Sequence, residues 1–123
     1  MAKILLVDDD QALATVFQTA LKNAGFQTVV AYDGKSGLAK AKSEKPDIIL
    51  LDQVLPDIEG SEVLKTLKSD PDTKKIVVSM LSNFGQDQLI KGAINAGAAD
   101  YILKYQVEPQ DVVSKAKSLL KEK

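Results

Sequence analysis

Residues 4–10 read Ile-Leu-Leu-Val-Asp-Asp-Asp, and residues 48–52 read Ile-Ile-Leu-Leu-Asp. Each stretch is a short apolar run that ends directly in carboxylates. A run that is apolar throughout, rather than alternating with polar residues, is typical of a strand buried on both faces of a parallel sheet. We therefore interpret both runs as buried strands.

Three more short apolar runs follow the same plan, and longer segments with helical periodicity separate all five. In the first such segment, apolar residues recur at three- and four-residue intervals from Leu13 to Ala24, which predicts an amphipathic helix. Gly25 follows where helices commonly end in a left-handed turn. The predicted strands are 4–7, 28–31, 48–51, 76–80 and 101–103, and the predicted helices are 11–24, 35–43, 61–69, 86–96 and 110–121.

Five consecutive strand–helix units predict an α/β fold with helices on both faces of a parallel sheet. Five strands are too few for an eight-stranded barrel. The remaining solution is an open, doubly wound (βα)5 sheet of the flavodoxin-like type, whose strand order is 2-1-3-4-5. The sequence does not itself fix that order. A chain of 123 residues is expected to form one domain, 1–123, with no output domain.

Composition removes several classes of chemistry. The chain has no Cys, no His and no Arg, and it contains 16 lysines and 17 acidic residues. These absences exclude thiol catalysis, Ser-His-Asp triads and histidine-ligated zinc. A net charge of −1 gives no case for nucleic-acid or membrane-surface binding. No stretch has the length of a membrane span or the features of a signal peptide, so we expect a cytoplasmic protein without membrane or direct nucleic-acid partners.

Polar residues gather where the predicted strands end. In an open parallel sheet, function sits beyond the carboxyl ends of the strands. Asp8 and Asp9 follow the first run, Asp52 follows the third, Ser82 the fourth and Lys104 the fifth. If the first and third strands are neighbours, the three carboxylates meet in one crevice.

Carboxylates that meet in this way repel one another. Two unit charges about 5 Å apart cost about 3 kcal/mol at an effective dielectric constant near 20. Lys104 supplies one compensating charge, and a divalent cation would supply two more. Ligands that are all oxygen suit Mg²⁺, Mn²⁺ or Ca²⁺ rather than zinc, and Mg²⁺ would fill its open positions with water and phosphate oxygens. The pattern therefore indicates metal-assisted phosphoryl chemistry.

Two side chains are candidate nucleophiles, Asp52 and Ser82. A serine needs an adjacent base, and a chain without histidine offers no obvious one. An ionised carboxylate needs none, so attack by Asp52 on phosphorus would give an acyl phosphate. Lys104 and Ser82 would bind the remaining phosphoryl oxygens.

These motifs together resemble the receiver domain of bacterial response regulators over essentially the whole chain. The resemblance rests on ILLVDDD at 4–10, PDIILLD at 46–52, LPDIEG at 55–60, Ser82, and AGAADYILK at 96–104. The order of these pieces and their spacing, 30 residues from 52 to 82 and 22 from 82 to 104, make it specific.

The resemblance implies a role for each residue of the site. Asp52 would be the phosphoacceptor, taking a phosphoryl group from a sensor histidine kinase or a phosphotransfer protein. Mg²⁺, with Mn²⁺ as an alternative, would be bound by Asp8, Asp9, Asp52 and the backbone carbonyl of Val54. Lys104 and Ser82 would contact the phosphoryl group, and Ser82 and Tyr101 would form the switch.

The resemblance also implies partners rather than enzymatic turnover. The protein would promote only its own phosphorylation and dephosphorylation, as a monomer or as a dimer that forms on phosphorylation. The kinase would dock near residues 11–15, around Gln11, Ala12 and Thr15. An unknown downstream protein would bind a responsive face that includes Lys91, Asn95 and Tyr101.

The sequence departs from the family pattern in two places. Tyr105 follows Lys104 where the family usually has proline, often after a cis peptide bond, and we predict a trans bond here because a non-proline cis bond costs about 3–4 kcal/mol. Val54 and Phe84, each two residues beyond a site residue, are apolar and cannot orient water by hydrogen bonding. We therefore expect slow self-dephosphorylation.

Two alternatives stay open on the sequence. A degenerate receiver would bind partners without phosphorylation, although the complete set of site residues argues against it. A small phosphatase with an aspartyl nucleophile would use Asp8 and Asp10, but Ala12 stands where that class has threonine. We predict that Asp10 instead caps a helix, and that Asp33-Gly34 is a turn.

Overall fold

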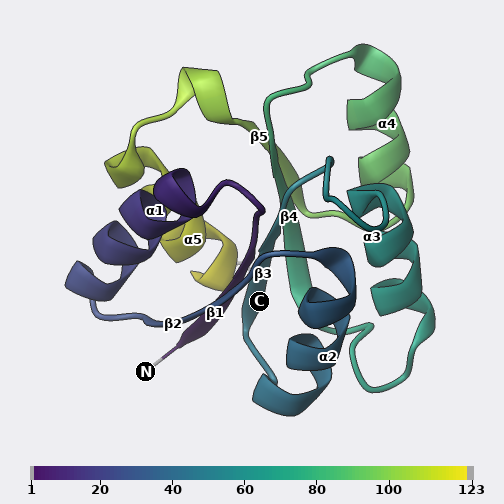
Figure 1. The fold of residues 1–123 in the computed structure, drawn as a ribbon, viewed down its shortest axis with the longest axis horizontal. Coiled ribbons are helices and arrows are strands. Elements are labelled where there is room, and N and C mark those ends of the chain that lie inside the picture. The colour runs from purple at the N-terminus through teal and green to yellow at the C-terminus, as the bar shows by residue number, and fades with distance from the viewer. Residues whose placement is uncertain (1, 122–123) are drawn as a thin grey trace.

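The computed structural model describes residues 2–121, and within them five parallel strands form one sheet in the order β2-β1-β3-β4-β5 (Figure 1). This confirms the predicted doubly wound α/β architecture. The strands are β1 (Lys3–Val7), β2 (Gln27–Ala31), β3 (Ile48–Leu51), β4 (Val77–Ser82) and β5 (Asp100–Leu103). The helices are α1 (Gln11–Asn23), α2 (Gly34–Glu44), α3 (Gly60–Ser69), α4 (Asp87–Asn95) and α5 (Pro109–Lys121).

Helices cover both faces of the sheet (Figure 1). Alternate residues of a strand point to opposite faces, so each central strand contributes to two cores. Ile48 and Leu50 pack with α1 and α5, and Ile49 and Leu51 pack with α2, α3 and α4. This two-sided burial explains why β1 and β3 are apolar at nearly every position. In the part of the chain that the structure describes, no helix is long and apolar enough to cross a membrane.

The register of the central strands sets the position of the acidic residues. Val7 pairs with Leu51, so Asp8 and Asp52 leave adjacent strands at the same level. The backbone N–H of Asp52 donates to the carbonyl of Val7 over 2.9 Å, which extends the ladder up to the site. The buried strands β1 and β3 therefore hold Asp8 and Asp52, the residues that directly follow them, side by side at one edge of the sheet.

Three local predictions differ from the structure. β4 continues to Ser82, which is therefore the last residue of the strand rather than the first one after it. A short 3₁₀ turn, Lys104–Gln106, follows β5 and was not expected. Asp33-Gly34 is not a simple turn: Asp33 is the N-cap of α2, accepting from the N–H of Ser36 at 2.7 Å, and Gly34 begins the helix. Aspartate is favoured both in turns and at helix N-caps, so the residue type alone could not distinguish the two structures.

Other local predictions are confirmed. The Asp10 carboxylate caps α1 by accepting from the N–H of Leu13 at 3.1 Å. Gly25 and Gly97 adopt positive φ angles of 99° and 109° directly after their helices, a conformation that glycine adopts without steric cost.

Candidate functional site

Three carboxylates gather at the carboxyl ends of β1 and β3. One oxygen from each of Asp8, Asp9 and Asp52 lies within 4.8 Å of the others. Asp8 and Asp52 are buried, with 1% and 7% of their surfaces exposed, whereas Asp9 is open to solvent. The three carboxylates that were expected to meet therefore do so.

Lys104 reaches this cluster from the end of β5, past the end of β4. Its ammonium nitrogen lies 2.7 Å from Asp8 Oδ2 and 2.9 Å from Asp52 Oδ2. The side chain of Lys104 is 4% exposed, so the contact is shielded from water. The structure thus brings four of the predicted site residues into one group of charges: Asp8, Asp9, Asp52 and Lys104.

The balance of charge in this group is negative. Burial alone would lower the pKa of Lys104, but its contacts with Asp8 and Asp52 outweigh burial and raise the pKa. Burial raises the pKa of Asp52, and the nearby charge of Asp8 raises it further. The contact with Lys104 lowers this pKa but does not outweigh the other two effects. One ammonium therefore does not neutralise the neighbouring carboxylates.

The donor set fits a hard divalent cation. Asp8 Oδ2 is buried and, despite its ion pair with Lys104, accepts no well-directed hydrogen bond within residues 2–121. Three carboxylates, one of them open to solvent, offer oxygen ligands and room for water. These features favour Mg²⁺ or Mn²⁺ over zinc, since the described residues include no nitrogen or sulfur ligand of the kind zinc prefers.

Ser82 and Tyr101 lie on the β4–β5 side and share a backbone partner. Ser82 is fully buried, and its Oγ accepts from the N–H of Phe84 at 3.1 Å. The Tyr101 hydroxyl donates to the carbonyl of Phe84 at 2.5 Å. Burial raises the pKa of Tyr101; the Ser82 hydroxyl opposes this and the Asp52 charge adds to it. The two predicted switch residues thus contact the two adjacent peptide units on either side of the Phe84 Cα atom.

The departures from the family pattern have structural counterparts. Residues 2–121 contain no cis peptide bond, so the bond between Lys104 and Tyr105 is trans, as predicted. The ammonium of Lys104 still reaches both carboxylates. Val54 and Phe84 are 51% and 44% exposed, so two apolar side chains meet solvent in the loops that leave β3 and β4.

Two residues between β3 and the first turn of α3 make contacts that were not predicted from the sequence. Asp57 accepts backbone hydrogen bonds from the start of α2, at Gly34 and Lys35. Gly60 is the first residue of α3, and a Cβ atom there would lie 2.1 Å from the backbone oxygen of Asp52. A glycine nine residues after the end of a strand is a weak signal of close backbone approach, and nothing local marks Asp57.

The surfaces predicted for partners are exposed. Gln11, Ala12 and Thr15 lie on the first turns of α1, and Lys91 and Asn95 lie on α4. Neither surface contacts the acidic cluster directly. Their roles remain predictions.

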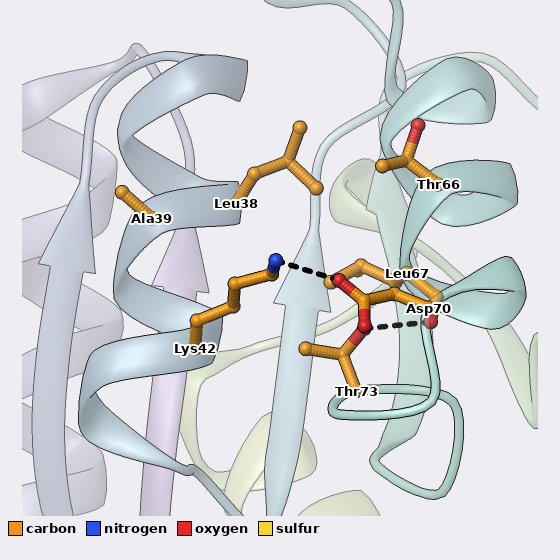
Figure 2. A pocket seen from close by; sticks show the side chains of 7 residues that line it. All are labelled: Leu38, Ala39, Lys42, Thr66, Leu67, Asp70 and Thr73. Atoms are coloured by element: carbon orange, nitrogen blue, oxygen red, sulfur yellow. Dashed lines mark hydrogen bonds and ion pairs between the residues drawn. The ribbon is translucent and has the colours of Figure 1, made fainter.

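A separate hollow of about 270 Å³ lies between α2 and α3 (Figure 2). It is lined by Leu38, Leu67 and Thr73 among others, and the Lys42–Asp70 ion pair crosses it at 2.8 Å. It contains none of the acidic site residues, so we do not assign the site chemistry to it.

Comparison with known proteins agrees with this geometry. A family model described as the response regulator receiver domain matches residues 4–117. The alkaline phosphatase synthesis transcriptional regulatory protein PhoP of Bacillus subtilis is 35% identical over 97% of this chain and 48% of its own length. The DNA-binding dual master transcriptional regulator RpaA of a Synechocystis strain is 35% identical over 98% of this chain and 50% of its own length.

Solved structures give the same result. A crystal structure of a CheY-like response regulator receiver domain protein from Methanospirillum hungatei has a TM-score of 0.92 and 32% identity, covering 99% of this chain and 95% of that one. The present chain spans about half the length of the curated relatives described above. The family match covers nearly all of the sequence that carries the fold and the acidic cluster, and this chain belongs to the response regulator receiver domain family.

Proposed function

We propose that this chain accepts a phosphoryl group on Asp52 and passes the signal to a partner through its β4–β5 side. The observation that carries the proposal is the buried Asp52 carboxylate, 2.9 Å from the Lys104 ammonium and beside Asp8 and Asp9. An ionised carboxylate in such a site attacks phosphorus without a separate base.

The transfer balances with a phosphohistidine donor. A carboxylate oxygen of Asp52 forms a bond to phosphorus, and the phosphorus–nitrogen bond of the donor breaks. The imidazole leaves with that electron pair and takes a proton from water. This donor class accounts for the lack of histidine here, because the histidine belongs to a sensor kinase or a phosphotransfer protein.

Each neighbouring side chain then has a task. Lys104 offers ammonium hydrogens to a phosphoryl oxygen as charge develops there. Asp8, Asp9, Asp52 and the carbonyl of Val54 would hold Mg²⁺, which when bound acts as a Lewis acid on the phosphoryl oxygens. Ser82 Oγ would turn from the N–H of Phe84 toward the phosphoryl group.

That turn supplies the readout. When Ser82 Oγ leaves the N–H of Phe84, the backbone of Phe84, whose carbonyl accepts from the Tyr101 hydroxyl, keeps only one of these two hydrogen bonds. The loop before α4 and the Tyr101 side chain can then shift together, which favours one surface over another. The partner would be a downstream protein that contacts Lys91, Asn95 and Tyr101.

Direct binding of nucleic acid is not part of this proposal. RpaA is described as DNA-binding, but this chain matches only half of RpaA. The near-neutral charge of this chain gives no electrostatic reason for DNA contact. We propose that the chain contacts proteins and acts without turnover of an external substrate.

Acetyl phosphate with Mg²⁺ tests the proposal by intact mass. The wild type is expected to gain one phosphoryl group, about 80 Da, and Asp52→Asn is expected to gain none. A wild type that gains no mass would favour a phosphorylation-independent binding module. Sustained turnover of p-nitrophenyl phosphate would favour a phosphatase.

The lifetime of the phosphorylated form is expected to be long. The side chains of Val54 and Phe84 carry no polar atom that could orient an attacking water. Introducing polar side chains with Val54→Asn and Phe84→Glu should speed the loss of mass. An unchanged decay rate in the double variant would contradict this part of the proposal.

A further inference from the structure

The loop that joins β3 to α3, residues 52–59, is fastened at two points. At its base, the N–H of Gly60 donates to the carbonyl of Gln53 at 2.8 Å, and the backbone of Asp52 lies close against Gly60. Near its far end, Asp57 accepts from the N–H groups of Gly34 and Lys35, which open α2. The backbone of the proposed phosphoacceptor forms part of the first point, and Val54 lies between the two points.

Both oxygens of Asp57 take part in the second fastening. Oδ1 accepts from Gly34 at 2.8 Å and from Ile58 at 2.9 Å, and Oδ2 accepts from Lys35 at 2.9 Å. These backbone donors hold the pKa of Asp57 below its usual value. A negative charge at the first turn of a helix is also favoured by the helix dipole. The carboxylate thus binds α2 in its ionised form.

The apolar contact beside Asp57 strengthens this link. A Cβ atom at Gly34 would lie 2.3 Å from Ile58 Cγ1, so the absence of a side chain lets Ile58 pack directly on the start of α2. The loop therefore meets the helix through one carboxylate and one apolar side chain. Neither contact can form unless residues 57 and 58 hold their present positions.

Helix α2 also has a local N-cap, Asp33. Asp33 accepts from the N–H of Ser36 at 2.7 Å as the local N-cap. Asp57 accepts two further hydrogen bonds, from the N–H groups of Gly34 and Lys35, which lie 23 and 22 residues away. Unlike Asp33, Asp57 therefore links the loop 52–59 to the helix.

Helix α2 is itself a fixed support. Near its other end, Lys42 pairs with Asp70 at the end of α3 over 2.8 Å (Figure 2). In its middle, Gly37 lies against Val7 of β1, 3.0 Å from where a Cβ atom would stand. A loop bound to α2 is consequently held relative to β1, which carries Asp8.

From these contacts we infer that Asp57 is a positioning residue for the acidic site. By holding the loop against α2, it keeps the Val54 carbonyl and the Asp52 carboxylate in the arrangement that binds a divalent cation. The inference rests on the proposed function, in which these groups are metal ligands. Asp57 itself does not touch the reacting atoms.

Mg²⁺ binding to the unphosphorylated protein tests this inference without any transfer reaction. The comparison uses wild type, Asp57→Ala and Asp33→Ala, with Kd measured by calorimetric or NMR titration with MgCl₂. Asp57→Ala should raise the Kd roughly tenfold, the lower end of what loss of an outer supporting contact costs a metal site. Asp33→Ala removes a cap from the same helix and should leave the Kd within about twofold of wild type.

Asp57→Asn serves as the conservative variant. Its amide oxygen can replace Oδ1 toward Gly34 and Ile58, but its NH₂ group cannot accept from Lys35. We expect a Kd between those of wild type and Asp57→Ala. Thermal midpoints measured without metal show whether each variant is folded, and Asp57→Asn carries the test if Asp57→Ala does not fold.

The outcomes separate this inference from the proposed function. Equal Kd values for wild type and the folded Asp57 variant, or equal weakening by Asp33→Ala, would overturn the positioning role. The same protein samples are then treated with acetyl phosphate at saturating Mg²⁺. Failure of the wild type to gain mass would contradict the proposed function, whereas the Mg²⁺ comparison would still decide the role of Asp57.

Discussion

The carboxyl edge of the sheet has two halves that differ in how firmly they are held. The acceptor half comprises β1, β3, the loop 52–59, Gly60 at the start of α3, and the start of α2. The response half comprises the loop 83–86, α4 and β5, which lie beyond the buried strand β4. Residues 4–7 of β1 and 48–51 of β3 are at most 1% exposed. Helix α4, by contrast, buries only Ala93, and Tyr101 of β5 is half-buried.

This difference matches two different physical requirements. Groups that bind charge work best when they are already in place, because they then need no reorganisation as charge develops. A segment that must move needs few buried apolar contacts, so that its displacement costs little. A phosphoryl group on Asp52 would therefore leave the acceptor half unchanged and displace the response half.

Glycine substitutions should show the contrast most strongly. Gly60→Ala in the acceptor half would place Cβ 2.1 Å from the backbone oxygen of Asp52, and we expect a loss of roughly 4 kcal/mol or failure to fold. Gly92→Ala in α4 meets no atom within 4 Å and should add up to about 1 kcal/mol of stability. Urea unfolding measures both, and a Gly60→Ala variant as stable as wild type would break the comparison.

Lysine substitutions should give the next largest difference. Lys104→Met leaves buried carboxylates without their cation and should cost about 3–5 kcal/mol, with part of the loss restored by Mg²⁺. In the response half, Asp100 of β5 pairs with Lys115 of α5 over 3.3 Å, and the Lys115 side chain is 49% exposed. Lys115→Met should therefore cost at most about 1 kcal/mol. Thermal unfolding with and without MgCl₂ measures both. Similar losses for the two variants would contradict the charge balance described for the site.

A smaller effect is expected from Tyr101→Phe, which removes the hydroxyl that donates to Phe84. The cost should be about 1 kcal/mol, the net contribution of one hydrogen bond. Hydrogen exchange should show faster opening confined to the loop 83–86 and α4. Faster exchange in β1 or β3 would instead indicate that the two halves move together.

The smallest effect concerns pH. The pKa of folded Asp57 lies below its usual value of 3.8, mainly because Gly34 and Lys35 donate to the carboxylate. Its stabilising contribution is therefore complete above about pH 5 and is lost as pH falls through the folded pKa. The stability difference between wild type and Asp57→Asn should accordingly shrink from pH 7 to pH 3 in urea titrations. A difference that grows on acidification would reverse the sign.

The sequence predicted much of the acceptor half because its signals are local. Apolar runs that end in aspartate located β1 and β3, and their shared sheet edge brought Asp8 and Asp52 together. The pairing of Lys104 with both carboxylates followed from the need to offset their charge. These features depend on periodicity and on strand ends, which one sequence displays.

The features that were not predicted depend on contacts between residues far apart in the sequence. Asp57 binds backbone groups 22 and 23 residues away, and Gly60 is required because the Asp52 backbone approaches it closely. Neither contact leaves a periodic trace. The end of β4 at Ser82 and the cap role of Asp33 were misplaced because polar residues are compatible with strand ends, turns and caps alike.

Locating the phosphoryl group tests the central claim most directly. Protein treated with acetyl phosphate and Mg²⁺ is reduced with borohydride, whose hydride converts an acyl phosphate to an alcohol as phosphate leaves. Peptide mass spectrometry should find residue 52, and no other carboxylate, converted to homoserine, about 14 Da lighter than aspartate. Conversion of a different acidic residue, or of none while Asp52 stays intact, would contradict the account.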